Sequence, residues 1–334
     1  MFATVAAAYP REPRAGEPDV LAEADERLAA GTADEAGHLE AVRGFAAAVL
    51  AEQEAAGVAI VTDGAVAHED RLRNLVRGLG GISTDEAVVL PDGSSARAAR
   101  FDRAPTWTRP ITVDDWRWAD GIAEQMVKQV IVGPYTIARS AASGGASREI
   151  LTLGLAEALN AELHALARAG CPFIQVDEGG LTSIGDDPAE WALYAESARR
   201  LTAGLDDHHL SLGVYRGAVH PSGHGSVLEA PYRSYLVDGL SGPDAWRFVF
   251  AVPLELGVIV GALDAADPTR DETEVMVWAL AWAANDGRTP ERLGIASNGS
   301  LRSIGRHAAR RKIELMGEAV GIASMGPQIG RAHV

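Results

Sequence analysis

Residues 172–185 decide the fold; they read Pro-Phe-Ile-Gln-Val-Asp-Glu-Gly-Gly-Leu-Thr-Ser-Ile-Gly. The segment 173–176 is a short, largely apolar run with aromatic and β-branched residues, which predicts a buried strand. Two carboxylates, Asp177 and Glu178, follow the run directly. A buried strand cannot hold charges in its middle, but parallel α/β folds place their chemistry where strands end. The stretch therefore predicts a parallel α/β fold with functional acids at a strand end; solvated loop acids are the alternative.

Short apolar runs alternate with helical patterns along the rest of the chain. Strands are predicted at 2–8, 58–62, 129–132, 173–176, 209–215, 247–252, 258–263 and 293–297. Helices are predicted at 21–56 (with a break near Gly31), 71–79, 112–125, 147–169, 188–203, 232–240, 273–285 and 303–319. Eight strands mostly separated by helices predict a TIM-type (β/α)8 barrel, built as one domain over residues 1–334. The link 253–257 departs from this pattern because it is too short for a helix.

An insertion and two helix ends can be predicted from local signals. Residues 82–101 contain the turn Pro91-Asp92-Gly93, which predicts a β-hairpin inserted after the second strand. Thr112 is expected to cap the helix that follows it, and Ser147 to cap the long helix that ends at Gly170. In the closing helix, Arg306 is expected on the outer face.

The composition narrows the classes of partner. The net charge is −16 and the pI is near 5, which opposes binding to nucleic acid or to an anionic membrane. Apolar residues make up 47% of the chain, enough for a full core. The single cysteine, Cys171, cannot form an internal disulfide and is expected to be a small packed residue. No run of 18 apolar residues and no signal peptide are seen, so a cytoplasmic protein is expected.

Polar residues follow most of the predicted strands and are the candidate site. Acids can hold an amine, and Arg can hold a carboxylate or phosphate through two hydrogen bonds. Two close carboxylates can also raise one pKa and supply a general acid or base. The candidates are His68 and Asp70 after the second strand, Tyr135 after the third, Asp177 and Glu178 after the fourth, Tyr215, Arg216, His220 and His224 after the fifth, Asp264 after the seventh and Asn298 after the eighth.

Several of these candidates have a structural alternative. Arg216 could form an ion pair with Asp177 or Asp264. His220 and His224 lie in a loop rich in Pro, Gly and Ser, where surface histidines are common. Their spacing would suit a metal on a helix, but the intervening Pro221 and Gly223 disfavour one. No Gly-rich phosphate loop or dinucleotide fingerprint is present.

Four motifs in the same order resemble the catalytic barrel of cobalamin-independent methionine synthase in its short, single-barrel form. They are Tyr9-Pro10, Thr62-Asp63-Gly64, Val132-Gly133-Pro134-Tyr135-Thr136-Ile137 and Ile174-Gln175-Val176-Asp177-Glu178. The resemblance covers most of the chain. It implies a barrel of the methionine-synthase and uroporphyrinogen-decarboxylase type, and an activity related to methyl transfer.

The family's metal ligands do not carry over. The resemblance implies a zinc site made by a His-x-Cys pair after strand five, a Glu at strand six and a Cys after strand eight. These positions fall on Gly213, Tyr215, Ala251 and Gly299. Zinc in that family turns a thiol into a bound thiolate. We therefore predict no metal and no cofactor at the family zinc site, and the methyl donor stays open.

Residues that bind the amino acid in the family are also replaced. The Glu of the Asp-Gly-Glu segment is Ala65, the Ser of the first strand is Ala8, and the aromatic residue after Gly-Pro-x-Thr-Ile is Ser140; only Asp177 remains. The chain is accordingly not expected to make methionine from homocysteine.

Three functions fit the sequence. The first is transfer of a methyl or other one-carbon group to a nitrogen, oxygen or carbon acceptor, with Asp177 or Glu178 as base or amine anchor and with Tyr215 and Arg216 orienting the substrate. The second is a lyase or hydrolase step on a small polar metabolite, with Asp177, Glu178 and His68 as acid and base. The third is a non-catalytic binding protein. This third protein could also regulate a partner. A small-molecule substrate is the expected partner of the enzymes, and a homodimer is allowed.

Overall fold

The computed structural model describes residues 1–6, 8–13, 16–67, 78–89, 95–141, 145–284 and 287–325; of 83–89, 95–99 and 102 only the backbone is described. The candidates His68 and Asp70, the predicted turn at 91–93 and nearly all of the helix predicted at 71–79 lie outside these residues. Among the described residues, no helix combines the length and the apolar character needed to cross a bilayer.

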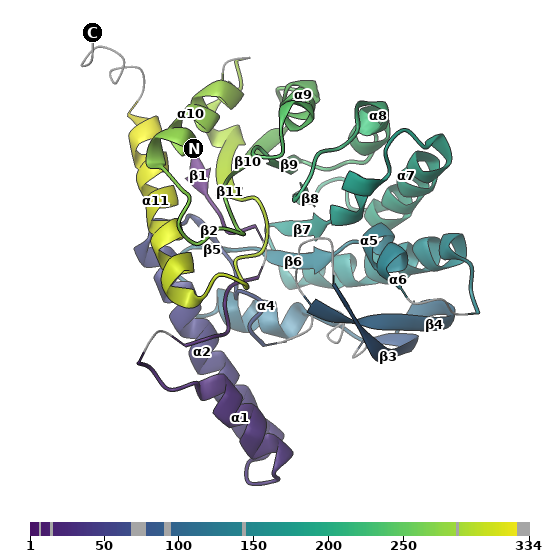
Figure 1. Ribbon diagram of the computed structural model, residues 1–334. Helices are drawn as coiled ribbons and strands as arrows, with labels where there is room; N and C mark the ends of the chain where they lie inside the picture. Colours follow the sequence, from purple (N-terminus) through teal and green to yellow (C-terminus); the bar gives the residue numbers. More distant parts are fainter. Residues whose placement is uncertain are drawn as a thin grey trace.

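A parallel sheet forms the centre of the molecule (Figure 1). Its seven strands lie in the order β1 (Phe2–Ala3), β11 (Leu293–Ser297), β10 (Gly257–Leu263), β9 (Ser234–Asp238), β8 (Leu210–Val214), β7 (Ile174–Asp177) and β6 (Gln129–Val132). β2 (Ile60–Val61) pairs in parallel with β5 (Met126–Val127), which precedes β6 by one residue. A parallel bridge joins Thr4, just after β1, to Ile60. The prediction of an α/β fold with a parallel sheet is confirmed.

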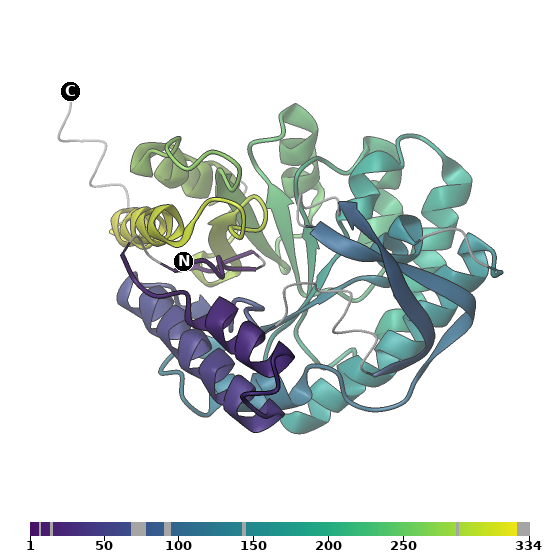
Figure 2. The same cartoon turned by 60° about the horizontal axis from the view of Figure 1, so that its bottom comes forward.

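Helices surround the strands, as Figure 2 shows. They are α1 (Val20–Ala29), α2 (Glu35–Ala55), α4 (Val113–Asp120), α5 (Pro134–Ser140), α6 (Arg148–Ala169), α7 (Pro188–Thr202), α8 (His224–Leu228), α9 (Pro243–Ala251), α10 (Thr273–Ala284) and α11 (Arg306–Ser324), with short 3₁₀ turns at Gly179–Ser183, Pro221–Gly223 and Pro290–Arg292. The ends of α6 are as predicted: Ser147 accepts a hydrogen bond from the Ile150 N–H, and Gly170 takes a left-handed φ of 96°.

The sixth strand differs from the prediction. The segment 232–240, predicted as a helix, contains β9, and the segment 247–252, predicted as a strand, lies mostly in α9. Pro243 starts α9 at its first turn, and Ala245, Phe248 and Val249 face the core at helical spacing. The helix that was not found between the predicted sixth and seventh strands is α9, which connects β9 to β10. The strand-six position after the correction is Asp238 rather than Ala251.

An antiparallel pair of strands, β3 (Leu79–Val89) and β4 (Ser95–Trp107), lies between β2 and α4 in the chain. It packs on α6, where the Glu162 carboxylate accepts a hydrogen bond from the Trp107 indole N–H (2.9 Å). The same carboxylate accepts from the N–H (2.8 Å) and the hydroxyl (2.9 Å) of Thr112. Thr112 therefore does not cap α4 with its side chain, contrary to the prediction.

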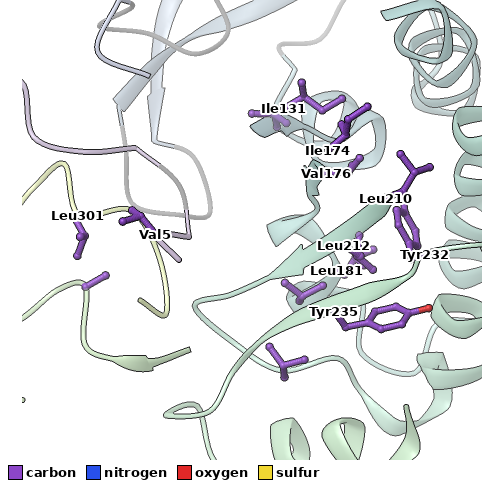
Figure 3. Packing of buried hydrophobic residues seen from close by; sticks show 14 of the residues in the cluster. Val5, Ile131, Ile174, Val176, Leu181, Leu210, Leu212, Tyr232, Tyr235 and Leu301 are labelled. Carbon is purple, nitrogen blue, oxygen red and sulfur yellow. The ribbon is translucent and has the colours of Figure 1, made fainter. Parts of the chain in front are cut away.

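The core has two parts, on the two faces of the sheet. The larger part lies between strands and helices; Figure 3 shows Ile174, Val176, Leu210 and Leu212 from neighbouring strands within it. The smaller part, the inner cluster, contains Ala6, Ile60, Phe173, Tyr215, Leu236, Ile259 and Ala296. Its members lie on or near β1, β2 and the four strands β8 to β11, with Phe173 just before β7.

Cys171 and Arg306 are both buried, as expected for the first and contrary to the prediction for the second. Cys171 is 5% exposed, and burial raises the pKa of its thiol to about 12, so the expectation of a packed residue is confirmed. Arg306 is not on the outer face: it is buried, ion-paired with Glu52 (3.0 Å), and lies over the Phe45 ring.

Candidate functional site

Asp177 ends β7 and is the buried carboxylate nearest the middle of the predicted site. Gln175, two residues earlier on the same face of the strand, donates a hydrogen bond to its Oδ1 (2.7 Å) and another to the Ala6 carbonyl (2.6 Å). The Lys128 amine, which lies between β5 and β6, donates to the Gln175 amide oxygen (2.7 Å). Lys128, Gln175 and Asp177 thus form a buried hydrogen-bonded row, which we call the Lys-Gln-Asp row.

Burial controls the charge of the amine in this row. Lys128 is 1% exposed, and burial lowers the pKa of its amine from 10.5 to about 7, although the Asp177 carboxylate opposes the shift. The amine can therefore exchange a proton near neutral pH. Because it donates to Gln175 in either state, its main structural effect is to fix which way the Gln175 amide points, and so which atom faces Asp177.

Glu178 points away from Asp177, toward the start of α5. Its carboxylate accepts hydrogen bonds from the Tyr135 N–H (3.1 Å), the Thr136 N–H (2.8 Å) and the Thr136 hydroxyl (2.5 Å). Burial raises its pKa to about 7, against the effect of these donors. A Cβ at Gly133 would lie 2.2 Å from the Glu178 carboxyl, so a glycine is needed there. The geometry gives Glu178 the role of a buried helix cap.

The end of β8 contributes Gly213, Tyr215 and Arg216. A Cβ at Gly213 would lie 2.7 Å from Asp177 Oδ1 and 3.3 Å from the Tyr215 ring, so both side chains border this position. Tyr215 is buried in the inner cluster. Arg216 is exposed and has a left-handed φ of 61°, with its aliphatic stem against Gly299. No hydrogen bond or ion pair of its guanidinium is found within the described part of the chain, so the alternative of a structural ion pair gains no support.

Asp238, at the end of β9, is a second buried carboxylate at the same edge of the sheet. It accepts hydrogen bonds from the Gly217 N–H (3.2 Å), the Leu240 N–H (3.0 Å) and the Asn298 amide (3.3 Å). Asn298 in turn accepts from the Ala265 N–H (2.9 Å). Asp238, Asn298 and Asp264 line a cavity of about 890 Å³ whose other walls include Asp267, Arg270, Asp271 and Glu272. The structure therefore brings Asn298 and Asp264 together, as predicted, around an acidic cavity.

Three predicted site residues point elsewhere. Tyr135 is buried, and its hydroxyl donates to Glu190 (2.6 Å), a partner of Arg148 on α6, so it faces the helical layer. The His220 imidazole accepts from the Ser222 N–H (3.4 Å) and is exposed. The His224 ring meets the Phe248 ring edge-on, with centroids 5.0 Å apart. No group of three or more His, Cys, Asp or Glu side chains that could hold a metal is found among the described residues.

Two residues of the site were missed from the sequence. Asp238 was not predicted as a site residue, because the segment that contains its strand was predicted as a helix. Its signal is a short apolar run that ends in Asp238-Gly239, as the run before Asp177 ends in an acid. Lys128 was not predicted as a site residue. Its signal is its place between Val127 and a predicted strand, since a lysine within an apolar run indicates a buried amine.

The comparisons with known proteins show which family the chain belongs to. The family model "Cobalamin-independent synthase, Catalytic domain" matches residues 2–206, more than half of the chain. The chain belongs to this family. The methionine synthase of Thermococcus kodakarensis is 29% identical over 294 residues, which cover 85% of this chain and 83% of that protein. The methionine synthase of Pyrococcus abyssi is 29% identical over 299 residues, with 85% and 82% covered.

Solved structures share the fold at lower identity. A B12-independent methionine synthase from Shewanella sp. W3-18-1, in complex with selenomethionine, superposes with a TM-score of 0.78 at 17% identity, covering 97% of both chains. A putative vitamin-B12 independent methionine synthase from Listeria monocytogenes superposes with a TM-score of 0.76 at 13% identity, covering 96% of this chain and 97% of that one. Membership of this family supports an enzyme of the methyltransferase type.

Other residues stand where the resemblance implies the zinc ligands of the family. At the positions where the resemblance implies the strand-five ligands, Gly213 has no side chain and Tyr215 is buried. An imidazole at Gly213 would collide with Asp177, since even a Cβ lies 2.7 Å from its Oδ1. Asp238 is a carboxylate at the same edge of the sheet, and its oxygens already accept three hydrogen bonds. A thiolate or imidazole donor set, which zinc prefers, is not formed by these side chains.

Proposed function

We propose that this protein transfers a methyl or other one-carbon group to a small, polar acceptor that is not a thiol, without zinc. The observation that carries the proposal is the close approach of Asp177 Oδ1 to the Cβ position of Gly213, 2.7 Å away. It puts a carboxylate where the resemblance implies a zinc-binding imidazole. A carboxylate can remove a proton from an amine, hydroxyl or carbon acid, but it cannot hold a thiolate as zinc does.

The residues suit an acceptor that carries both charges. Asp177 and the acidic cavity bordered by Asp238 and Asp264 favour a cationic amine. Arg216, exposed beside Gly299, can bind a carboxylate through two hydrogen bonds. Both charges of a zwitterionic metabolite would therefore have partners at this edge of the sheet.

Methyl transfer by this route needs no metal. The acceptor atom attacks the carbon of the transferred methyl group while its proton passes to the Asp177 carboxylate. The bond between that methyl group and the donor breaks, and the donor atom keeps the electron pair. A methylsulfonium donor leaves in this way as a neutral thioether, whereas a methylated folate must first take up a proton from water on the nitrogen that loses the methyl group. The Lys-Gln-Asp row orients the carboxylate, and Glu178 holds the start of α5 beside it.

The arrangement of the strands is also inferred to be a complete barrel. The β2–β5 pairing, the Thr4–Ile60 bridge and the continuity of β5 with β6 would join the two ends of the seven-stranded sheet. Members of the inner cluster from both ends support closure. The β3–β4 pair would then be the insertion after the second barrel strand, and residues 1–334 would form one domain.

The test combines metal content with activity. The protein is purified without added zinc, its metal content is measured by elemental mass spectrometry, and transfer from methylated folate or S-adenosylmethionine is followed by mass spectrometry with amine, hydroxyl, carbon-acid and thiol acceptors. We expect a metal-free protein that methylates a non-thiol acceptor. Asp177→Asn should lower kcat at least about 100-fold, because removing a general base costs this much.

The control is Asp186→Asn, which changes an exposed aspartate on the loop after β7 and should leave kcat unchanged. Stoichiometric zinc together with transfer to homocysteine would refute the proposal. Equal loss of activity in both variants would show that Asp177 has no special role.

A further inference from the structure

Helix α10 is apolar on all sides. Met276, Ala279, Leu280 and Ala283 face the core. The opposite side bears Val275, Trp278 and Trp282, which are 43%, 53% and 42% exposed. Glu274 is the one charged residue in the helix. A helix that is hydrophobic all round is normally buried, so the outer face of α10 requires a cover that the chain itself does not supply among its described residues.

Aromatic side chains of α9, which lies beyond β10 from α10 in the ribbon of Figure 1, contact the exposed tryptophans of α10. The Trp278 and Trp282 rings stack with centroids 5.4 Å apart, Trp246 lies 5.6 Å from Trp278, and Phe250 lies 6.0 Å from Trp282. Leu240 precedes α9 and, like Val275, lines the acidic cavity. We call this surface the α9–α10 patch; it comprises Leu240, Trp246, Phe250, Val275, Trp278 and Trp282.

The size of the patch matches half of a dimer interface. Phe250 is 42% and Leu240 43% exposed; with aromatic side chains of ~200 Å² each and these and the preceding exposed fractions, the patch presents ~400 Å² of apolar surface. Each subunit of a standard-size homodimer buries ~800 Å², of which about 65% is apolar. The patch thus supplies most of the apolar area that one subunit needs.

Charge and spacing point to a second copy as the partner. The chain has a net charge of −16, so two copies repel except where the surface is uncharged. Val275, Trp278 and Trp282 are spaced by three and four residues, the spacing of a helix–helix seam. Of the cations near the patch, Arg247 is ion-paired with Asp244 (2.5 Å), and Arg270 lines a cavity with Asp238, Asp264, Asp267, Asp271 and Glu272, so these surroundings do not favour anionic lipid headgroups.

We propose that the α9–α10 patch is a two-fold interface between two copies of this chain, with α10 of one copy packed along α10 of the other. A two-fold axis pairs the same patch with itself, so the seam meets its own pattern in both directions. Because Leu240 and Val275 also line the acidic cavity, the interface borders the mouth of the candidate site in each subunit.

The test is sedimentation equilibrium of the full chain at micromolar concentration. The wild type should sediment at twice its mass of 35.1 kDa. Trp278→Glu should be monomeric. Its dimer dissociation constant should be at least about 1,000-fold higher than that of the wild type, because the hot-spot side chain is lost from both subunits. The matched control is Ile150→Glu on α6, which is also 53% exposed and should stay dimeric.

Thermal melting shows whether each variant folds, and an exposed side chain such as Trp278 should leave the monomer folded. If Trp278→Glu fails to fold, Trp282→Glu and Trp278→Ala replace it. On dilution of the wild type, the tryptophan emission should shift to longer wavelength as the stacked rings enter water. A monomeric wild type, a dimeric Trp278→Glu, or binding of a monomeric wild type to phosphatidylcholine vesicles through this patch would each overturn the proposal.

Discussion

Replacing Lys128 by Met should change how stability depends on pH. The folded protein holds this amine at a pKa of about 7, whereas in the unfolded chain it returns to 10.5. Between these two values the unfolded chain binds a proton that the folded chain does not bind. Stability of the wild type therefore rises with pH in this window, by about 3 to 4 kcal/mol from pH 7 to pH 10 for this group alone.

In Lys128→Met this rise should be absent, because methionine fills a similar volume and cannot titrate. Loss of the donor to Gln175 should add a pH-independent cost of about 1–3 kcal/mol. The assay is urea unfolding followed by circular dichroism at several pH values. The tyrosines that ionise near the upper limit are common to both proteins, so the difference between the two curves isolates the amine.

Lys312→Met is the matched control. Lys312 is as buried as Lys128, but its amine is ion-paired with Asp271 and does not belong to the Lys-Gln-Asp row. This variant should be less stable throughout and should keep the rise that Lys128 causes. If wild type and Lys128→Met give parallel curves from pH 7 to pH 10, the argument that burial holds this amine near neutrality is refuted.

Two further substitutions test the end of β8. Gly213→Ala should lower stability by about 1–3 kcal/mol, since its Cβ would lie 2.7 Å from Asp177 Oδ1, whereas Gly225→Ala, with nothing within 4 Å, should not; equal melting temperatures would contradict the crowding. Arg216→Gly should raise stability by about 1 kcal/mol over Arg216→Ala, because only glycine relieves the φ of 61°, and both should raise KM for the acceptor; an unchanged KM would remove Arg216 from the site.

Elements with local signals were predictable from the sequence. α6 has a serine cap, helical periodicity and a terminal glycine, and β6 and β11 are apolar runs that end at glycine-containing loops. Each signal lies within a few residues of the element it defines, so no tertiary information is needed.

The sixth strand was not predictable in this way, because composition and periodicity disagreed. The segment 247–252 is rich in aromatic and β-branched residues, which favours a strand, yet Pro243 and the spacing of Ala245, Phe248 and Val249 favour a helix. In the folded protein the segment is a helix, which buries these three side chains in the core. Because of this error, Asp238 was not predicted as a site residue, and the end of the sixth strand was assigned to Ala251.

Candidate site residues could be proposed from the sequence, but their contacts could not. Asp177 and Glu178 are adjacent in the sequence, yet strand alternation turns them to opposite faces, one toward the inner cluster and one toward α5. The partners of Asp177 cannot be read from its neighbourhood, because Gln175 also bonds the carbonyl of Ala6, 169 positions away. Long-range register, which sequence patterns do not contain, creates the Lys-Gln-Asp row.

The different partners of the two buried carboxylates assign them different tasks. Asp238 accepts hydrogen bonds from Gly217, Leu240 and Asn298, which fix it between three loops and leave it to bind a cationic group by charge. Asp177 is held by Gln175, whose orientation depends on an amine that exchanges protons near neutral pH. A carboxylate held through a neutral amide is suited to take up a proton from a substrate. We therefore propose that Asp177 takes up the proton and that Asp238 binds the amine.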